Sequence, residues 1–367
     1  MRWAWRAGRL FGIDVYVHAT FLLLLGWVGT NQYLRERNVG AAAVAVGFVA
    51  LVFTSVVLHE LGHALMARRF GITTKDITLL PIGGVARLER MPEKPAHELL
   101  VALAGPAVNV VIAGLLVGVV WLLGGSPGLD APDATHLTRA PLLTRLAWVN
   151  VSLAAFNLLP AFPMDGGRVL RALLAMRQGA ARATRRAAAI GQAFAVALGL
   201  LGVFVNPVLV LVAVFVWFGA AAEAGAEQTK AALAGLTVRA AMQTDFRVLA
   251  PHDGLAVAAQ ALLAGAQVDF PVVDGANGLV GVLTRARLVE GLSAGGPTVE
   301  TQAVMTRRFE TAEPGERLDA AWARLRTSDC RSMPVVDAGR VVGLVTAENL
   351  GELMMLHGAA LAAKAGA

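Results

Sequence analysis

The chain has 367 residues, of which 56% are hydrophobic and 16% charged, and its mean hydropathy is +0.61. A soluble domain has about a quarter charged residues, so this composition excludes a wholly water-soluble protein. The net charge of +6 does not indicate nucleic-acid binding, because the arginines cluster at the ends of apolar runs, as they do beside membrane spans. The single cysteine, Cys330, excludes an internal disulfide and a cysteine-based zinc site, and we expect it to be a small buried residue.

The first apolar stretch follows three arginines, Arg2, Arg6 and Arg9, as in a secretory signal peptide. No small-residue cleavage site follows it, and Trp27 suits the interfacial end of a membrane span. We therefore expect residues 15–32 to form the first membrane helix and to remain in the mature protein.

The second apolar segment, residues 41–68, contains the sequence His-Glu-Leu-Gly-His after an uncharged run. Positions i and i+4 share one face of a helix, so His59 and His63 can present two imidazoles to one metal ion. Glu60 can take a proton from a water on that metal. Two core histidines bonded to backbone carbonyls are the structural alternative. Ionisable residues at bilayer depth are costly and mark functional sites, which favours the metal.

The next segment, residues 76–90, is apolar but too short to span a membrane, and it contains Pro81, Gly83 and Gly84. This composition predicts a strand-like or re-entrant segment. Such backbone is tolerated at membrane depth only where protein or water satisfies its polar groups. A surface loop is the alternative.

A third membrane helix is expected at residues 97–123, with Pro106 kinking it and Asn109 offering an amide at depth. Asn109 can simply hydrogen-bond two helices together, which is the common use of such a residue. A loop rich in glycine, proline and aspartate follows at 124–141.

A fourth span is expected at residues 142–162, which run into the sequence NLLPAFPMDGGR. Two prolines and two glycines beside an acid predict that the helix unwinds here, and this frees Asp165 to reach inward as a third metal ligand. A basic helix at 168–186 and two spans, at about 187–204 and 207–222, complete this part of the chain.

The basic residues are distributed unevenly between the connecting segments. They crowd the N-terminus and residues 68–94 and 168–186, whereas residues 33–40 and 124–141 carry few. The positive-inside rule then predicts six spans in the cell (inner) membrane with both termini cytoplasmic. The metal site would lie in the cytoplasmic part of the bilayer.

From about residue 230 the composition becomes that of a soluble domain with an internal repeat. The pattern FPVVD…GVLT at 270–284 recurs as MPVVD…GLVT at 333–346. The separation of 62–63 residues fits one β-α-β-β-α unit per copy, so two copies can pair. We predict a membrane domain over 1–225 and a regulatory or docking pair over 226–367, with copies at about 236–292 and 299–357.

The sequences HELGH on an apolar helix, GPxxN and NLLPAFPMDGGR together resemble the site-2 protease family of intramembrane zinc metalloproteases, and the two repeats resemble a CBS-domain pair. The resemblance covers nearly the whole chain. It implies one Zn²⁺ per chain bound by His59, His63 and Asp165, with Glu60 as the catalytic base. It also implies cleavage of single-pass transmembrane proteins, such as an anti-sigma or pro-sigma factor. The expected fold is an α-helical polytopic membrane protein of about six spans with an α/β CBS pair.

Two asparagines, Asn109 and Asn157, are candidates for orienting a metal ligand or holding the tetrahedral oxyanion. Residues 76–90, as a strand, could pair with an unwound substrate by edge addition. Two other classes of function remain. The intact Glu60 argues against an inactive relative that only binds a membrane partner. Ionisable residues concentrated at 59–63 and 165, rather than spread over several spans, argue against a CBS-gated transporter.

CBS domains that bind adenine nucleotides commonly have a threonine or serine followed three residues later by an aspartate. Here Thr284 is followed by Arg287 and Thr346 by Asn349, so neither copy keeps the carboxylate. Asn349 can bond a ribose hydroxyl without the strength of a charged acid, whereas Arg287 can only donate. We expect weak nucleotide binding confined to the copy with Thr346 and Asn349, or none. On either outcome the pair would form a homodimer.

Overall fold

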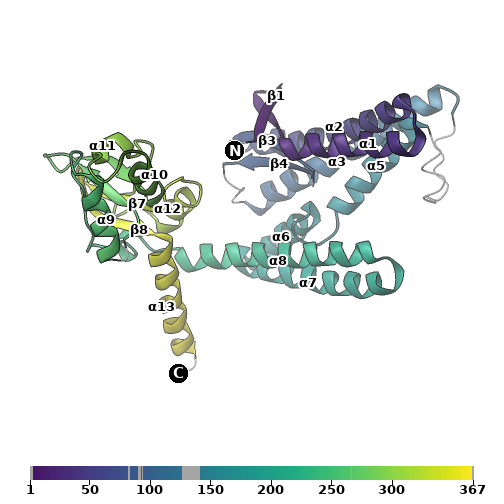
Figure 1. The fold of residues 1–367 in the computed structure, drawn as a ribbon. Coiled ribbons are helices and arrows are strands. Elements are labelled where there is room, and N and C mark those ends of the chain that lie inside the picture. Colours follow the sequence, from purple (N-terminus) through teal and green to yellow (C-terminus); the bar gives the residue numbers. More distant parts are fainter. Residues whose placement is uncertain are drawn as a thin grey trace. The chain divides into compact units, whose positions relative to one another are not determined.

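The computed structural model describes residues 3–81, 83–89, 92, 94–125, 141–265 and 267–365 (Figure 1). Most of the expected loop at 124–141 lies outside these residues. The chain divides into two compact units, residues 1–225 and 226–367.

The first unit is built from apolar helices and one sheet. Its helices are α1 (Ala19–Glu36), α2 (Val39–Arg69), α3 (Pro95–Leu122), α5 (Leu142–Asn157), α6 (Asp165–Gln178), α7 (Ala180–Val205) and α8 (Pro207–Leu233), the last of which continues into the second unit. In the part of the chain that the structure describes, α2, α3, α7 and α8 are long and apolar enough to cross a membrane.

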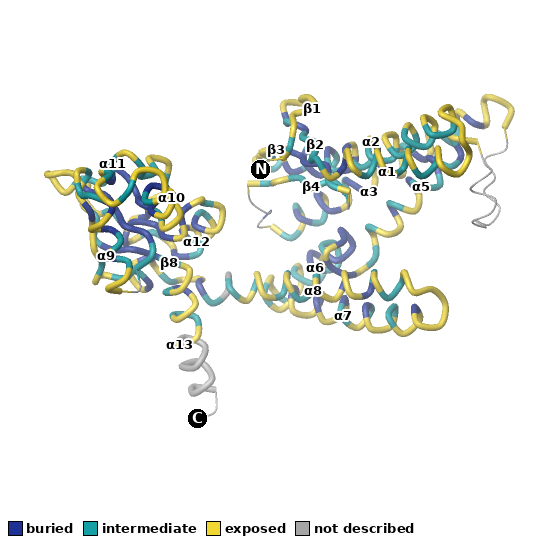
Figure 2. Tube along the Cα trace, in the orientation of Figure 1, coloured by how far each residue is buried: buried dark blue, intermediate teal, exposed yellow. Residues whose placement is uncertain are grey.

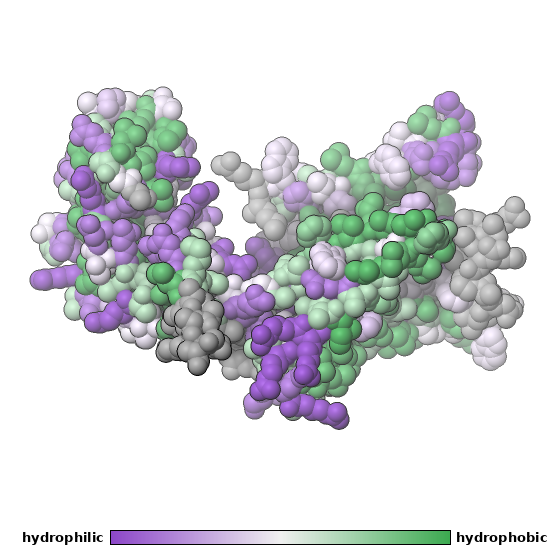
Figure 3. All heavy atoms as spheres, turned by 90° about the horizontal axis from the view of Figure 1, so that it is seen from below, coloured by the Kyte–Doolittle hydropathy of each residue, from purple (hydrophilic) through white to green (hydrophobic). Residues whose placement is uncertain are grey.

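The surface of these four helices suits lipid rather than water. Only 11% to 33% of the residues in their most apolar stretches are buried, and Figure 2 shows long exposed stretches along them. Large apolar side chains such as Leu122 and Phe204 lie exposed, and apolar residues cover broad areas of this unit in Figure 3. A helix in a bilayer has this distribution because lipid tails accept apolar side chains.

Four of the six expected spans are thus found as long apolar helices, and the other two correspond to α1 and α5. These helices have 18 and 16 residues, and α1 ends in polar residues. The expected start of the first span at residue 15 was wrong. Residues 13–18 form a strand instead, and α1 begins only after His18, whose side chain accepts a hydrogen bond from the Thr20 amide (3.3 Å).

The sheet lies against the helix that carries the His-Glu-x-x-His motif. Its strands, in the order β1-β2-β3-β4, are β1 (Ala4–Leu10), β2 (Ile13–His18), β3 (Thr74–Leu80) and β4 (Gly83–Leu88). The strand-like reading of residues 76–90 is confirmed, since β3 and β4 form an antiparallel pair. Alternating apolar residues of β2 and β3 pack on α2, where Ile13 and Ile77 meet Val57 and Leu61. β4 is an edge strand of this sheet.

The predicted break before Asp165 is confirmed, because α5 ends at Asn157 and α6 begins at Asp165. The intervening turn folds back on the first turn of α6. A Cβ atom on Gly166 would lie 2.2 Å from the Leu159 carbonyl oxygen, and one on Gly167 would lie 2.6 Å from the backbone of Ala161. Only glycine allows this approach, which fixes where α6 starts.

The second unit contains two similar βαββα-type copies. Their elements are η1 (Val238–Ala240), α9 (Leu255–Ala264), β5 (Phe270–Val273), β6 (Leu279–Leu283) and α10 (Arg285–Gly295) in the first copy. The second copy has α11 (Thr301–Val304), α12 (Leu318–Leu325), β7 (Ser332–Asp337), β8 (Arg340–Thr346) and α13 (Ala347–Ala365). Each hairpin has its own buried apolar cluster.

The two copies exchange their leading segments. Gln243, before the first hairpin, pairs with Leu344 in β8, and Thr306 pairs with Val282 in β6. The two copies are therefore interlocked rather than only in contact. Cys330 is buried, as expected, and burial raises the pKa of its thiol.

Candidate metal centre

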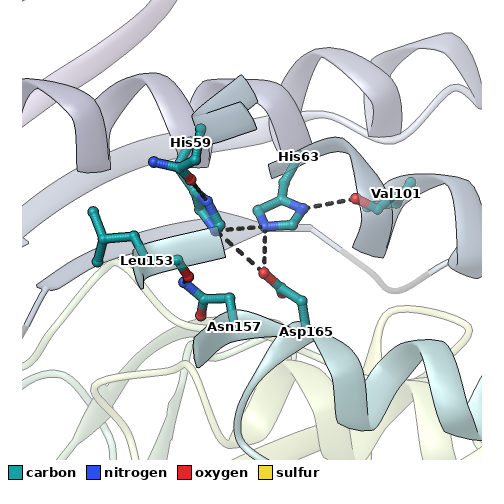
Figure 4. A network of polar contacts seen from close by, with 7 residues as sticks. His59, His63, Val101, Leu153, Asn157 and Asp165 are labelled. Carbon is teal, nitrogen blue, oxygen red and sulfur yellow. Dashed lines mark hydrogen bonds and ion pairs between the residues drawn. The ribbon is translucent and has the colours of Figure 1, made fainter. Parts of the chain in front are cut away.

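Two histidines on one face of α2 meet an aspartate from α6. The Nε2 atoms of His59 and His63 lie 3.1 Å apart, and Asp165 Oδ2 lies 3.2 Å from the first and 3.0 Å from the second (Figure 4). All three side chains are buried. The helical spacing of i and i+4 accounts for the histidines, and the break before α6 accounts for Asp165.

Helix α3 contacts the Nδ1 atoms of both His59 and His63, on the side of each ring away from the cluster. The Val101 carbonyl oxygen lies 2.7 Å from His63 Nδ1 (Figure 4). Asn109 Oδ1 lies 2.5 Å from His59 Nδ1. Because a carbonyl only accepts, His63 Nδ1 must carry the proton, which leaves the lone pair on Nε2 facing the cluster. Hydrogen bonds of this kind orient metal-binding histidines.

A glycine on α3 leaves room between the ring nitrogens. A Cβ atom on Gly105 would lie 2.2 Å from His63 Nε2 and 2.7 Å from His59 Nε2. Gly62 of the motif lets the helices approach, because its Cβ would lie 2.7 Å from the Ala104 carbonyl oxygen. The glycines thus bring α3 close to α2 without filling the space at the nitrogens.

These residues fit a metal ion. An imidazole lone pair of His63 and the carboxylate of Asp165 point at each other across 3.0 Å, and two acceptors at that distance are stable only with a proton or a cation between them. Two imidazoles and one carboxylate are the protein ligands of a catalytic zinc site, which keeps its fourth position open. In the part of the chain that the structure describes, the three side chains are the one such group of potential ligands.

The predicted base lies beside this cluster and against the sheet. Glu60 follows His59 on α2 and is half-buried. A Cβ atom on Gly84, in β4, would lie 2.8 Å from Glu60 Cγ, so the edge strand passes directly over the Glu60 side chain. This brings the strand that could accept a peptide next to the carboxylate expected to act on it.

The two predicted asparagines have different surroundings. Asn109 is fully buried and contacts His59, as described above. Asn157 lies at the end of α5 near Asp165 (Figure 4), but its amide nitrogen donates to the Leu153 carbonyl oxygen (3.0 Å). Asn109 therefore contacts a proposed ligand directly, whereas Asn157 lies beside the cluster.

A buried cluster of charges, missed in the sequence, holds α6 in place. Arg171 of α6 donates to Glu98 of α3 through Nε (2.7 Å) and to Glu223 of α8 through Nη1 (2.8 Å). Arg171 and Glu98 are both more than 90% buried. Glu98, the one acid of the apolar helix α3, was the signal available in the sequence, since a charge in such a helix needs a partner.

The residues proposed for nucleotide binding cap helices. Thr284 accepts a hydrogen bond from the Arg287 amide (3.3 Å) at the start of α10, and Thr346 accepts one from the Asn349 amide (3.1 Å) at the start of α13. Asn349 Oδ1 is 2.7 Å from the Thr346 hydroxyl, and Arg287 pairs with Glu290. Both threonines thus have a structural role that requires no nucleotide.

A buried His-His-Asp group beside a glutamate, with both histidines on a helix long and apolar enough to cross a membrane, is the arrangement expected of a membrane metallopeptidase. The sequence profile of Peptidase family M50 matches residues 47–136 and 132–202, and that of the CBS domain matches residues 238–294 and 301–355. The chain is 34% identical over 284 residues to zinc metalloprotease MJ0392 of Methanocaldococcus jannaschii, which covers 77% of this chain and 78% of that protein.

Two further comparisons found partial similarities. Stage IV sporulation protein FB of Bacillus subtilis is 31% identical over 153 residues, covering 41% of this chain and 49% of that protein. The solved site-2 protease from Methanocaldococcus jannaschii is 37% identical, covers 60% of this chain and 95% of that one, and has a TM-score of 0.43. The chain belongs to Peptidase family M50 and is a zinc metalloprotease of the site-2 protease type with a CBS-domain pair.

Proposed function

We propose that His59, His63 and Asp165 bind one zinc ion per chain and that Glu60 is the general base of peptide hydrolysis. The observation that carries this proposal is the convergence of two imidazole nitrogens and a carboxylate oxygen within 3.2 Å, beside the space left by Gly105. Zinc bound there would lower the pKa of a coordinated water and polarise the scissile carbonyl.

The side chains around the cluster supply the remaining chemistry. Glu60 takes a proton from the attacking water and delivers it to the leaving amine. Asn109 orients His59 through the 2.5 Å contact. Asn157, near Asp165, can turn its amide from the Leu153 carbonyl to the oxyanion of the tetrahedral intermediate.

We propose that the substrates are single-pass transmembrane proteins and that β4 receives the segment to be cut. A helical peptide hides its carbonyls in its own hydrogen bonds, so the segment must unwind before hydrolysis. An edge strand stabilises an unwound peptide by backbone pairing. The closeness of Gly84 in β4 to Glu60 supports this path, because a paired peptide would lie beside the base.

A cleavage assay tests the function directly. A tagged library of single-pass membrane proteins would be incubated with the purified enzyme and with the Asp165→Ala variant, and zinc would be measured in both. We expect wild-type protein to contain one zinc and to cut a subset, and Asp165→Ala to lose zinc and cleavage together. Full zinc content and full activity in Asp165→Ala would show that another residue is the third ligand.

For the topology, we propose that both termini and the CBS pair are cytoplasmic. Six crossings, or the four of the long helices alone, both return the chain to its starting side. The basic segments at 68–94 and 168–186 support the cytoplasmic side. Reporter fusions after residues 90, 180 and 367 should read cytoplasmic, and a fusion after residue 35 should read extracytoplasmic. An external C-terminus would contradict this arrangement.

We propose that the CBS pair regulates the peptidase as a homodimer and binds adenine nucleotide weakly, through Thr346 and Asn349, or not at all. The capping role of Thr346 supports the weak or absent binding, since its hydroxyl already accepts the Asn349 amide. Calorimetry of the full chain and of Asn349→Asp with ATP, ADP and AMP would test this. We expect tighter binding in the variant, because a carboxylate gives charge-assisted bonds to ribose hydroxyls. Two tight, equivalent sites in the wild type would contradict it.

A further inference from the structure

A line of buried polar side chains runs from His59 away from the metal centre. Asn109 Nδ2 donates to Asn150 Oδ1 (2.9 Å) on α5. Asn150 Nδ2 donates to the Leu146 carbonyl oxygen (2.9 Å) and to Ser55 Oγ (3.2 Å). Both asparagines are fully buried, and none of the motifs singled out in the sequence contains Asn150.

The backbone carbonyl of Leu146 determines how the Asn150 amide is oriented. The Leu146 carbonyl can only accept, so Asn150 must turn its NH₂ group toward it. Ser55 agrees with this orientation, because its hydroxyl donates to the Leu51 carbonyl (3.3 Å) and so is free to accept from Asn150. The carbonyl oxygen of the Asn150 amide therefore faces Asn109.

The orientation of Asn150 in turn determines which nitrogen of His59 carries the proton. Asn109 must present its NH₂ group to the Asn150 oxygen, and this turns Asn109 Oδ1 toward His59. An oxygen that only accepts requires the proton on His59 Nδ1, so the lone pair lies on Nε2, toward Asp165 and His63. In His63 the proton is held on Nδ1 by direct contact with the Val101 backbone carbonyl. In His59 it is held there by the side-chain amides of Asn109 and Asn150.

We propose that Asn150 is a positioning residue for the metal centre: through Asn109 it fixes the proton of His59 on Nδ1 and so keeps Nε2 free to bind the metal. The inference rests on the proposed role of His59 as a zinc ligand. Without Asn150, Asn109 can rotate its amide and present NH₂ to His59, which moves the proton to Nε2 and removes a ligand. Helix α5 thus supplies both the orientation of His59 and, after its terminal turn, the chain leading to Asp165.

The test is a double-mutant cycle on zinc affinity, measured by competition with a chelator on the full chain in detergent. Asn150→Leu keeps the number and branching of the side chain's non-hydrogen atoms and removes the amide, and we expect a zinc affinity about 10- to 100-fold weaker, the usual effect of losing an indirect partner of a ligand. Asn109→Leu should have an effect of the same size, and adding Asn150→Leu to it should weaken binding no further. Ser55→Ala is the matched control, because Asn150 keeps the Leu146 carbonyl, and it should change affinity less than about twofold.

Unchanged zinc affinity in Asn150→Leu, or losses that multiply in the double variant, would overturn the proposal. Should the Leu variants not fold, nuclear magnetic resonance of zinc-free wild-type protein with isotope-labelled histidine decides the matter. The proposal requires a proton on His59 Nδ1, whether or not Nε2 also carries one in the zinc-free protein, and an Nδ1 without a proton would refute it. A wild-type protein that binds no zinc would instead refute the proposed function, so the two failures are distinguishable.

Discussion

The two units of the chain differ in where they place polar side chains. Within the described residues, twelve buried polar or charged residues belong to the first unit and three to the second. In the first unit these include the proposed ligands, the asparagine pair and the Arg171 cluster, and they bond largely to one another. Most ion pairs of the second unit lie at its surface.

This difference follows from the two solvents. Lipid tails cannot hydrogen-bond, so a buried polar group in the membrane unit is costly without a protein partner, and the proposed ligands, the asparagine pair and the Arg171 cluster all have one. Water satisfies the polar residues of the second unit, where a threonine or arginine carries little information about function. The contrast predicts large effects from changes at the membrane unit's polar sites and small ones in the second unit.

The largest effect is expected from filling the space between the histidines. Gly105→Ala places a methyl group within 2.7 Å of both ring nitrogens, so we expect the protein to lose zinc and with it all cleavage. Gly114→Ala on the same helix is the control, because no atom lies within 4 Å of its Cβ position. Metal analysis of both variants checks this. Normal zinc content in Gly105→Ala would mean that the metal binds elsewhere.

A smaller change separates chemistry from binding. Glu60→Gln keeps the shape of the side chain but cannot accept a proton, so we expect turnover to fall by about a hundredfold to ten-thousandfold with zinc content unchanged. Cleavage rates and metal content measured on one preparation provide the test. More than a few per cent of wild-type cleavage would show that Glu60 is not the base.

The next prediction concerns the buried ion pairs of Arg171, which can be compared with a partly exposed ion pair in the second unit. Arg171→Met leaves Glu98 and Glu223 without their cation, and we expect a loss of about 3–5 kcal/mol in the free energy of unfolding. Thermal unfolding in detergent would measure it. Combining Arg171→Met with Glu98→Met and Glu223→Gln should recover most of the loss, because the charges are then removed together. A triple variant as unstable as the single one would contradict this explanation.

The smallest effect is expected at the corresponding pair of the second unit. The Arg324 guanidinium, by hydrogen bonding, holds the pKa of Glu316 below its ordinary value of 4.5. The pair is partly exposed, so Arg324→Met should cost less than about 1 kcal/mol. Because the folded pKa is the lower one, this stabilisation is complete above pH 4.5 and is lost as the pH falls below it.

Hydrogen exchange across residues 310–325 in wild type and Arg324→Met, at pH 7 and near pH 3, would measure this difference. The two proteins should differ slightly at pH 7 and converge at the lower pH. A difference that grows on acidification would show that the pair does not stabilise the fold through the Glu316 carboxylate.

The sequence predicted those residues of the candidate site that a regular helical spacing or a helix break brings together. His59 and His63 follow from the helical repeat, and Asp165 follows from the proline and glycine residues that end α5. The strand at 13–18 was missed because its apolar residues adjoin an apolar helix, and the boundary depends on pairing with β3. Asn150 could not be found, since a single asparagine in an apolar helix gives no indication of the neighbours that it will meet.

The separation of the ligands along the chain has a consequence for biosynthesis. Asp165 follows His63 by 102 residues, so the ribosome completes the two histidines well before the proposed third ligand. At about 5–20 residues per second, the interval is about 5–20 seconds. During that time the nascent chain offers only two of the three proposed ligands. If all three bind the zinc ion, the enzyme cannot cut neighbouring proteins that are being inserted into the same membrane until most of its own first unit has been synthesised.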